Sequence, residues 1–358
     1  MDQTKELQKV FEEFSPMLDS WWPYVIGLIM GIAAAISLAI FRSYMGGNSC
    51  PSEDRIDGKI VVITGATSGI GKVTAFELAK RGGHVILAVR DIENGAKVAD
   101  EIKTLTGAKA EVRMVDLSSL KSVRDFADKL EVNEVDILVN NAGIAFHPYE
   151  KTEENFEMHF VTNYLGHFLL TQLLLPKLEA AKQGRIINVT AQAYSTSSIN
   201  LEDLNLENNY SARQAFGQSK LALVMMTIFL SGYLKDSNVT CNSVNPGLVR
   251  GTRHMRSSPI EHGYFIKFIM YPWLWLCLKN PLQGAQTTIY AAVSKDLDET
   301  TGEYLSDCEI KKTAISPNDS IVKQLYAKSM LLVKPYLRST KLETQQTNLD
   351  GKTIVEES

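Results

Sequence analysis

Cysteine is scarce in this chain of 358 residues, and its four cysteines, Cys50, Cys241, Cys277 and Cys308, lie far apart. The sequence therefore lacks the close cysteine pairs of a zinc site or a redox dithiol. The six histidines form no short spacing with carboxylates that is typical of a metal site, so we predict no metal. An excess of positive charge is also lacking: the formal net charge is -4 and the basic residues are scattered, which argues against a nucleic-acid partner.

Internal repeats and low-complexity arrays are absent as well. Hydrophobic residues make up 45% of the chain and charged residues 22%, which excludes a largely disordered protein and allows a real core. A chain of this length holds one large α/β domain with appendages, and a second independent fold is not required.

One long uncharged run is present, from Trp21 to Phe41. As a helix it would extend roughly 30 Å, about the thickness of a bilayer core, and we predict a single transmembrane span. A cleaved signal peptide is the less favoured alternative, because it would be shorter and would follow basic residues, whereas this leader is acidic. A buried core helix is not expected, because apolar residues occupy every face.

The orientation of this span follows from its flanks. Arg42 lies directly after the run, and the leader before it is net acidic, which predicts a lumenal N-terminus and a cytosolic main domain. The glycosylation sequons at Asn188, Asn238 and Asn318 should then remain unmodified.

After a polar linker, apolar strands alternate with longer helical segments, which predicts a parallel sheet with helices on both faces. The expected fold class is α/β, with a single doubly wound Rossmann domain. Strands are expected at Ile60–Thr64, His84–Val89, Ala110–Val115, Ile137–Asn140, Gly184–Val189, Thr240–Val244 and near Glu303–Leu305. The expected division is a leader over residues 1–20, a transmembrane helix over 21–41, a linker over 42–57, the Rossmann domain over 58–336 and a flexible tail over 337–358.

The first expected strand runs into a glycine-rich turn, Thr64-Gly65-Ala66-Thr67-Ser68-Gly69-Ile70-Gly71, and then into a helix. Glycines in this setting permit a tight turn and a close approach of the backbone to a pyrophosphate, and the helix N-terminus supplies N–H donors to the anion. The strand-turn-helix context predicts a dinucleotide site.

Further motifs follow in order: Asp116-Leu117, Asn140-Asn141-Ala142-Gly143, Asn163 in NYLGHF, Lys220, and Pro246-Gly247. With them, the region from residue 57 to about 310 resembles the short-chain dehydrogenase/reductase family. The segments NYLGHFLLTQLLLPKL, LEDLN, NPGLVRG, QGAQTTIYAAV and GEYLSDC are similar to membrane-associated retinol dehydrogenases and to the oxidoreductase domain of WW-domain oxidoreductase.

The resemblance implies roles for individual residues. Asp116 should contact the adenine, the Asn-Asn-Ala-Gly segment should line the ribose, and Pro246-Gly247 should lie beside the nicotinamide. The expected cofactor-binding residues are Gly65, Ser68, Gly69, Ile70, Gly71, Arg90, Asp116, Leu117, Asn141, Ala142, Gly143, Lys220, Pro246 and Gly247.

The choice between NAD(H) and NADP(H) should be decided at the end of the second strand, where the adenosine 2′ position lies. Arg90 stands there and Asp91 just beyond, and Asp91 is equally well explained as the N-cap of the next helix. Because arginine matches a 2′-phosphate, we favour NADP(H) over NAD(H).

Enzymes of the family use a Tyr four residues before a Lys as the proton donor or acceptor, and a Ser that orients the reacting oxygen. In this chain the Tyr position is Phe216, and the family's spacing maps the Ser onto Ala191. A phenyl ring cannot exchange a proton and a methyl group donates no hydrogen bond. Lys220 and Asn163, the other two catalytic positions, are retained.

Four hydroxyl groups are candidates to replace the missing ones: those of Thr190, Ser219, Tyr194 and Tyr210. The segment Pro259–Pro281 is rich in Phe, Ile, Trp and Leu and is expected to be a lid over an apolar ligand, an interfacial segment on the membrane, or ordinary core.

Three function classes follow. The first is a cofactor-binding, catalytically impaired protein or pseudoenzyme, and the second an active oxidoreductase of apolar alcohols or ketones with an unconventional proton donor. The third is a membrane scaffold, acting through long apolar helices that form homodimer interfaces in the family. The resemblance also suggests the endoplasmic reticulum as the membrane.

Overall fold

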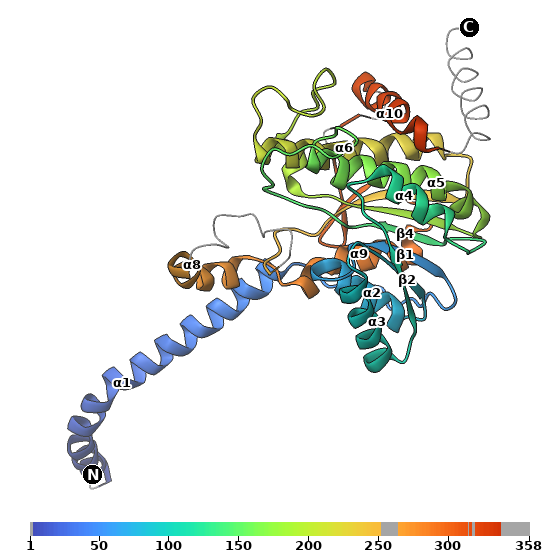
Figure 1. Ribbon diagram of the computed structural model, residues 1–358. Coiled ribbons are helices and arrows are strands. Elements are labelled where there is room, and N and C mark those ends of the chain that lie inside the picture. The colour runs from blue at the N-terminus through green and yellow to red at the C-terminus, as the bar shows by residue number, and fades with distance from the viewer. Residues whose placement is uncertain (1–2, 252–263, 314, 317–318, 338–358) are drawn as a thin grey trace.

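The computed structural model describes residues 3–251, 264–313, 315–316 and 319–337, and is drawn in Figure 1. One eight-stranded sheet has the order β3-β2-β1-β4-β5-β6-β7-β8. Its strands are β1 (Ile60–Thr64), β2 (His84–Val89), β3 (Ala110–Met114), β4 (Ile137–Asn140), β5 (Gly184–Val189), β6 (Val239–Asn245), β7 (Tyr304–Ser306) and β8 (Glu309–Lys311). All neighbours pair in parallel except β7 and β8, which are antiparallel.

Helices cover both faces of this sheet (Figure 1). The longer ones are α2 (Gly69–Lys80), α3 (Ile92–Thr106), α4 (Leu120–Asp128), α5 (Gly166–Ala180), α6 (Ala212–Tyr233), α8 (Tyr264–Cys277), α9 (Pro281–Val293) and α10 (Ser320–Val333). Short turns are η1 (Phe160–Leu165), η2 (Gln192–Thr196), η4 (Lys295–Leu297) and η5 (Lys334–Tyr336). The predicted single, doubly wound α/β fold is confirmed.

Strand β8 was not predicted from the sequence. Its partner β7 begins and ends one residue later than the strand expected near its position, and a two-residue turn of Asp307 and Cys308 joins the pair. Both turn residues have positive φ, +53° and +59°, as a two-residue hairpin loop with a type I′ turn requires. The usual Asn-Gly signal is missing and each strand has three residues, too few for an alternation pattern to reveal them.

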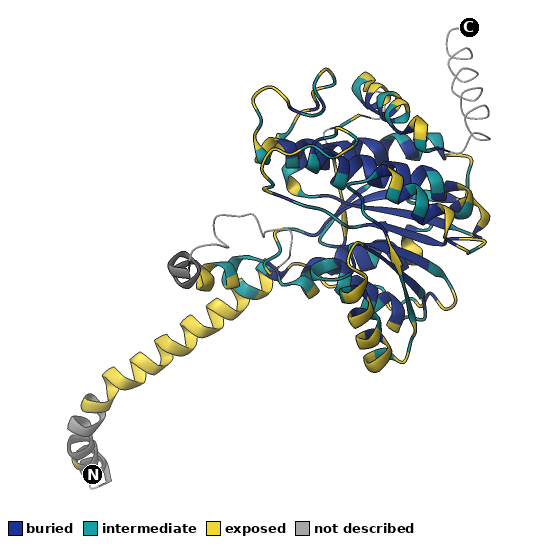
Figure 2. Ribbon diagram, in the orientation of Figure 1, coloured by how far each residue is buried: buried dark blue, intermediate teal, exposed yellow. Residues whose placement is uncertain are grey.

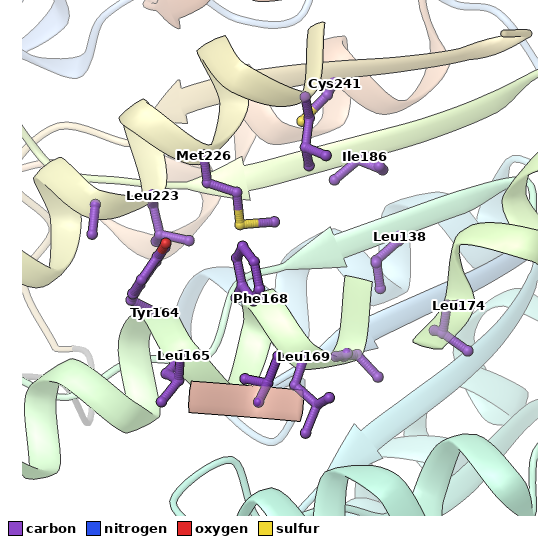
Figure 3. Close-up of a cluster of buried hydrophobic side chains, with 14 of the residues drawn as sticks. Leu138, Tyr164, Leu165, Phe168, Leu169, Leu174, Ile186, Leu223, Met226 and Cys241 are labelled. Atoms are coloured by element: carbon purple, nitrogen blue, oxygen red, sulfur yellow. The ribbon is translucent and has the colours of Figure 1, made fainter. Parts of the chain in front are cut away.

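The core has two parts, one on each side of the sheet. Figure 3 shows the larger part, in which Leu138 and Ile186 of the sheet meet Phe168 and Leu169 of α5 and Met226 of α6. Helix α6 is apolar enough to cross a membrane, but 78% of its most apolar window is buried, so it is a core helix.

The helix α10 packs across α5 and α6. The ring of Tyr326 stacks on Phe229, with 3.8 Å between centroids, and lies 5.1 Å from Phe168 at a steep angle. The hydroxyls of Tyr164 and Ser329 are hydrogen-bonded at 2.8 Å. Part of the apolar surface expected to form either core or a dimer interface therefore contacts the chain's own C-terminal helix.

The N-terminal helix α1 (Gln3–Gly46) projects away from the domain (Figure 1). Its part from Ser20 to Gly46 has a mean hydropathy of 2.4 in its most apolar window, none of it buried, and is a candidate membrane span. Residues 20–41 are exposed in Figure 2, whereas Gly46 at the end of the helix is buried. The helix is longer than the predicted span, because it also includes residues of the leader and the first five residues of the expected linker, 42–46.

Candidate functional site

The glycine-rich turn lies between β1 and α2, as the sequence predicts. Gly65 and Gly69 have φ of +67° and +57°, a backbone region that favours glycine. Ser68 is the N-cap residue of α2, and its side chain makes no capping hydrogen bond. Its hydroxyl and the N–H groups of the first helical turn can therefore serve an anion such as a pyrophosphate.

Close packing explains the third glycine of the turn. A Cβ on Gly71 would lie 2.3 Å from Asn141 Nδ2 and 2.6 Å from the Gly65 carbonyl oxygen. Asn141 in turn donates from Nδ2 to the carbonyl oxygen of Thr64 at 2.8 Å. The glycine-rich turn and the Asn-Asn-Ala-Gly segment are thus fitted to each other.

A hydroxyl at the end of β1 connects the two segments. Thr64 Oγ1 accepts hydrogen bonds from the backbone N–H groups of Asn141 and Ala142, at 2.9 and 3.0 Å, and lies 2.9 Å from His167 Nε2. Burial lowers the pKa of His167 to about 3, so the ring is neutral. Because His167 Nδ1 faces the Asn163 carbonyl oxygen at 2.9 Å, Nδ1 carries the proton and Nε2 accepts from Thr64.

Asn163 lies in η1, a π-helical turn of the kind that often marks functional sites. Its side chain is fully buried and has three partners. Oδ1 accepts from Ile144 N at 2.8 Å, while Nδ2 donates to the Ile144 carbonyl oxygen at 3.0 Å and to Ser219 Oγ at 2.9 Å. Asn163 therefore ties the segment after Gly143 to α6.

Lys220 is buried beside the end of β5, where its Nζ donates to the carbonyl oxygen of Val189 at 2.9 Å. No carboxylate among the described residues forms an ion pair with it. Burial lowers the pKa of Lys220 to about 8. An ammonium group held here with one backbone acceptor retains donors for a ligand such as the hydroxyls of a ribose.

The two positions without hydroxyls lie beside these residues. Ala191 follows β5 in extended conformation and leads into η2, and Phe216 lies near the start of α6; both are half-buried. The turns η1 and η2 both pack on α6. Gly217 makes this approach close, because a Cβ there would lie 1.9 Å from Ser197 Oγ. Beside Asn163 and Lys220, this part of the structure therefore offers a phenyl ring at Phe216 and a methyl group at Ala191.

Three of the four candidate substitutes are engaged elsewhere. Thr190 Oγ1 donates to the Val244 carbonyl oxygen at 3.0 Å. Ser219 Oγ donates to the Phe216 carbonyl oxygen at 2.7 Å while it accepts from Asn163, and Tyr210 donates to the His147 carbonyl oxygen at 2.7 Å.

Tyr194 differs from these three. It is buried in η2, and its ring centroid lies 4.9 Å from that of Tyr304. No hydrogen bond from its hydroxyl to another described residue is present. Tyr194 is therefore the one candidate whose hydroxyl is not already committed within the described structure.

The remaining predicted residues lie at the carboxyl ends of the strands. Arg90 is exposed directly after β2 and makes no hydrogen bond or ion pair with a described residue. Asp91 accepts from Asn94 N at 3.0 Å, which confirms its capping role. Asp116 Oδ1 accepts from Ser118, and Gly247, with φ of +76°, donates its N–H to Asn245 Oδ1 at 3.0 Å. Leu117 and Pro246 are buried.

This end of the sheet fits a nicotinamide dinucleotide. The glycine-rich turn and helix N-terminus suit its pyrophosphate, and Lys220 suits a ribose. Such a cofactor supplies or accepts a hydride when bound. The fold and site together define a dinucleotide-binding protein of the dehydrogenase class.

The chain belongs to the short chain dehydrogenase family, which matches residues 59–262. Retinol dehydrogenase 13 of Mus musculus is 42% identical over 316 residues, which cover 86% of this chain and 92% of that protein. Retinol dehydrogenase 11 of Homo sapiens is 39% identical over 318 residues, covering 87% and 96%. The crystal structure of an uncharacterised protein from Mycobacterium paratuberculosis is 34% identical with a TM-score of 0.63 and covers 80% of this chain and 98% of that one.

Thr64 and His167 were not among the residues selected from the sequence. A usable signal exists for His167, because it follows Asn163 by four residues and so lies one helical turn further on the same face. The role of Thr64 has no such local signal, since its partners come from segments about 77 and 103 residues away.

Proposed function

We propose that this protein is a membrane-anchored, NADP(H)-binding member of the family with impaired catalysis. The observation that carries the proposal is the combination of Phe216 and Ala191 with an otherwise intact frame around Asn163 and Lys220.

Hydride transfer between a nicotinamide and an alcohol or ketone needs a second partner for the proton. Oxidation of an alcohol releases the hydroxyl proton as the carbon loses hydride, and reduction of a ketone reverses both transfers. General acid–base catalysis contributes about 10²- to 10⁴-fold, and one well-placed donor to the reacting oxygen about 10²- to 10³-fold. Phe216 supplies no proton and Ala191 no donor, so bound substrate lacks both contributions.

The preference for NADP(H) rests on Arg90. Its guanidinium is exposed at the end of β2 and is not engaged by another described residue, so it can pair with a 2′-phosphate. The nearby Asp91, which would otherwise favour a free ribose hydroxyl, is used as a helix cap.

The membrane proposal rests on α1, with the domain on the cytosolic side and the endoplasmic reticulum as the expected membrane. Asn238 is exposed and can serve as a glycosylation reporter, as can the exposed Asn209 of the sequon Asn-Tyr-Ser. Asn188 is buried in β5 and would not be a good acceptor in the folded domain. We expect Asn238 to carry no glycan and the domain to be digested by protease outside sealed vesicles. Protection of the domain from protease, or a glycan on Asn238, would show that the orientation is the opposite one.

The central experiment measures binding and turnover on the same purified full chain. We expect saturable binding of NADPH, weaker binding of NADH, and background turnover with a panel of retinoids, steroids and aldehydes. Robust NADPH-dependent turnover that is lost in Lys220→Ala would contradict impaired catalysis. Failure to bind either cofactor would instead favour the scaffold class.

A second candidate is an active oxidoreductase of apolar alcohols or ketones, favoured by the relatives named retinol dehydrogenase. In that case Tyr194 is the first proton donor to test. Turnover by the parent protein that disappears in Tyr194→Phe, with NADPH binding unchanged, would support this candidate.

A further inference from the structure

The last turn of α1 is fixed to the domain by several contacts. Arg42 Nη2 donates to Gln283 Oε1 at 2.9 Å, and the guanidinium carbon lies 5.6 Å from the ring centroid of Trp275. Gly46 also packs on Gln283, since a Cβ there would lie 2.4 Å from its Nε2. Just beyond the helix, Asn48 Nδ2 donates to the Asp307 carbonyl oxygen at 3.1 Å. The candidate span therefore ends on the domain itself and not on a free tether.

Helix α8 lies beside this end of α1 (Figures 1 and 2) and contacts it. In the part of α8 whose side chains are described, residues 271–277, three aromatic residues are exposed: Tyr271 by 62%, Trp273 by 63% and Trp275 by 42%. Clustered aromatic side chains are unusual on a protein surface that faces only water. Tryptophan and tyrosine are enriched where a membrane meets water.

The length of the span indicates where α8 lies relative to the bilayer. If Trp21 and Trp22 lie at one interface, a bilayer core of roughly 30 Å places the opposite interface about 20 residues later, near Arg42. Arg42 is the residue that contacts Trp275, so α8 lies at the level where lipid headgroups would begin. Helix α8, with its exposed aromatic residues, thus contacts α1 at the end of the span, whose apolar residues are exposed as well.

The same end of the domain carries the candidate site. Helix α9, whose first turn holds Arg42 through Gln283, continues to Gly284. A Cβ on Gly284 would lie 2.5 Å from Val249 Cγ2 and 3.4 Å from Ile70 Cγ1. The membrane anchor is thus linked through one helical turn to the glycine-rich turn and to the segment that follows Pro246-Gly247.

We propose that α8 is an interfacial helix that inserts Tyr271 and Trp273 into the headgroup region of the leaflet where α1 ends, and so holds the carboxyl-terminal edge of the sheet against the bilayer. The partner of the patch is a lipid surface. This inference rests on the membrane anchoring by α1 proposed above. Of the predicted segment Pro259–Pro281, residues 259–263 lie outside the described structure.

The chain has four tryptophans, two at the start of the span and two in α8, which allows a direct test. In Trp21→Phe/Trp22→Phe/Trp275→Phe, Trp273 is the single remaining tryptophan. This full-length variant is reconstituted into phosphatidylcholine nanodiscs at one copy per disc, with or without lipids brominated on their acyl chains. We expect blue-shifted emission, loss of most of it with the brominated lipids, and protection from aqueous iodide.

The matched control is Trp273→Phe/Trp275→Phe, which keeps Trp21 and Trp22 in α1. Its emission should also be quenched by brominated lipids. If the control is quenched while Trp273 is open to iodide, the interfacial role of α8 is wrong and the anchor stands. If neither is quenched, the anchor fails as well.

Two further outcomes would also overturn the proposal. Trp273 shielded from both quenchers in single-copy discs would mean that α8 packs on its own chain. Shielding that is present only when discs hold two copies would assign the patch to a second molecule. Binding of NADPH by each variant, equal to that of the parent, shows that the domain is folded.

Discussion

The proposed cofactor end and the proposed reaction end of this site are built from different parts of the protein. The cofactor end is mostly backbone: the turn at Gly65 and Gly71 is fitted to Asn141 and held by Thr64, so its shape is part of the core. The proposed reaction end depends on side chains at the start of η2 and near the start of α6. Two hydroxyls can be absent there without disturbing the fold, because phenylalanine packs as tyrosine does and alanine leaves the strand end intact.

The difference shows why the two functions can separate. Loss of the dinucleotide site would require breaking a packed turn. In the proposed function, the proton path is lost through two side chains alone, Phe216 and Ala191, while the hydrogen bonds of Asn163 and Lys220 stay in place. The predictions below test this separation.

The largest effect is expected from restoring the reaction end. The double change Ala191→Ser with Phe216→Tyr should raise turnover by about 10²- to 10⁴-fold over the parent, because it returns both the oxygen donor and the proton donor. Steady-state kinetics with NADPH and a carbonyl panel measures this. Each single change should restore much less, since the two groups act together.

The double change in a Lys220→Ala background is the matched control and should stay near background. Equal turnover in the presence and absence of Lys220 would mean that the restored hydroxyls do not use the expected frame.

Lys220 lies between the two ends. In the absence of cofactor, its buried charge should lower the free energy of unfolding. The pKa of Lys220 is lowered to about 8 by burial, so the folded state resists protonation that the unfolded chain accepts up to about its usual 10.5. The free energy of unfolding should therefore rise with pH between about 8 and 10.5, and the penalty should be fully present below pH 8.

The variant Lys220→Met should remove this rise and stabilise the cofactor-free protein at pH 7 by up to about 3 kcal/mol, while it loses NADPH affinity. Denaturant titration of parent and variant across this pH range measures the effect. If the free energy of unfolding rises with pH between 8 and 10.5 equally in the parent and in Lys220→Met, another group titrates in this window.

A third, smaller effect is expected at the adenosine end. Arg90→Asp should lower NADPH affinity by about 10- to 100-fold, because a charge-assisted hydrogen bond contributes roughly 1.5–3 kcal/mol, and should leave NADH binding nearly unchanged. Isothermal titration with both cofactors measures the preference. The exposed Lys103→Asp in α3 is the control for the change of net charge. A parent protein that binds both cofactors equally would remove the basis for the assignment.

The smallest effect concerns packing of the glycine-rich turn. Gly71→Ala should destabilise the domain by about 1–3 kcal/mol and weaken cofactor binding, because its Cβ would overlap Asn141 and the Gly65 carbonyl. Thermal unfolding and NADPH titration measure both consequences.

Gly232→Ala is the matched control in α6, where no atom lies within 4 Å of the added Cβ. It should leave binding unchanged and stabilise the helix slightly. Loss of binding in both variants would contradict a specific role of the turn.

The sequence alone determined the alternation of strands and helices, because burial of apolar strands on both faces leaves continuous runs that are readable locally. It also located the glycine-rich turn and the absence of hydroxyls at Ala191 and Phe216, which are matters of residue type and spacing. The short hairpin of β7 and β8 escaped because three residues carry no periodicity.

Only the tertiary structure decided which hydroxyls are engaged and what lies beside the candidate span. The partners of Thr64, Ser219 and Tyr210 come from segments 56 to 103 residues away or from backbone atoms, and no local pattern encodes such contacts. The same holds for Arg42, whose contacts with Trp275 and Gln283 span more than two hundred residues. Long-range contacts of this kind depend on the register and packing of whole elements, which exist only once the chain has folded.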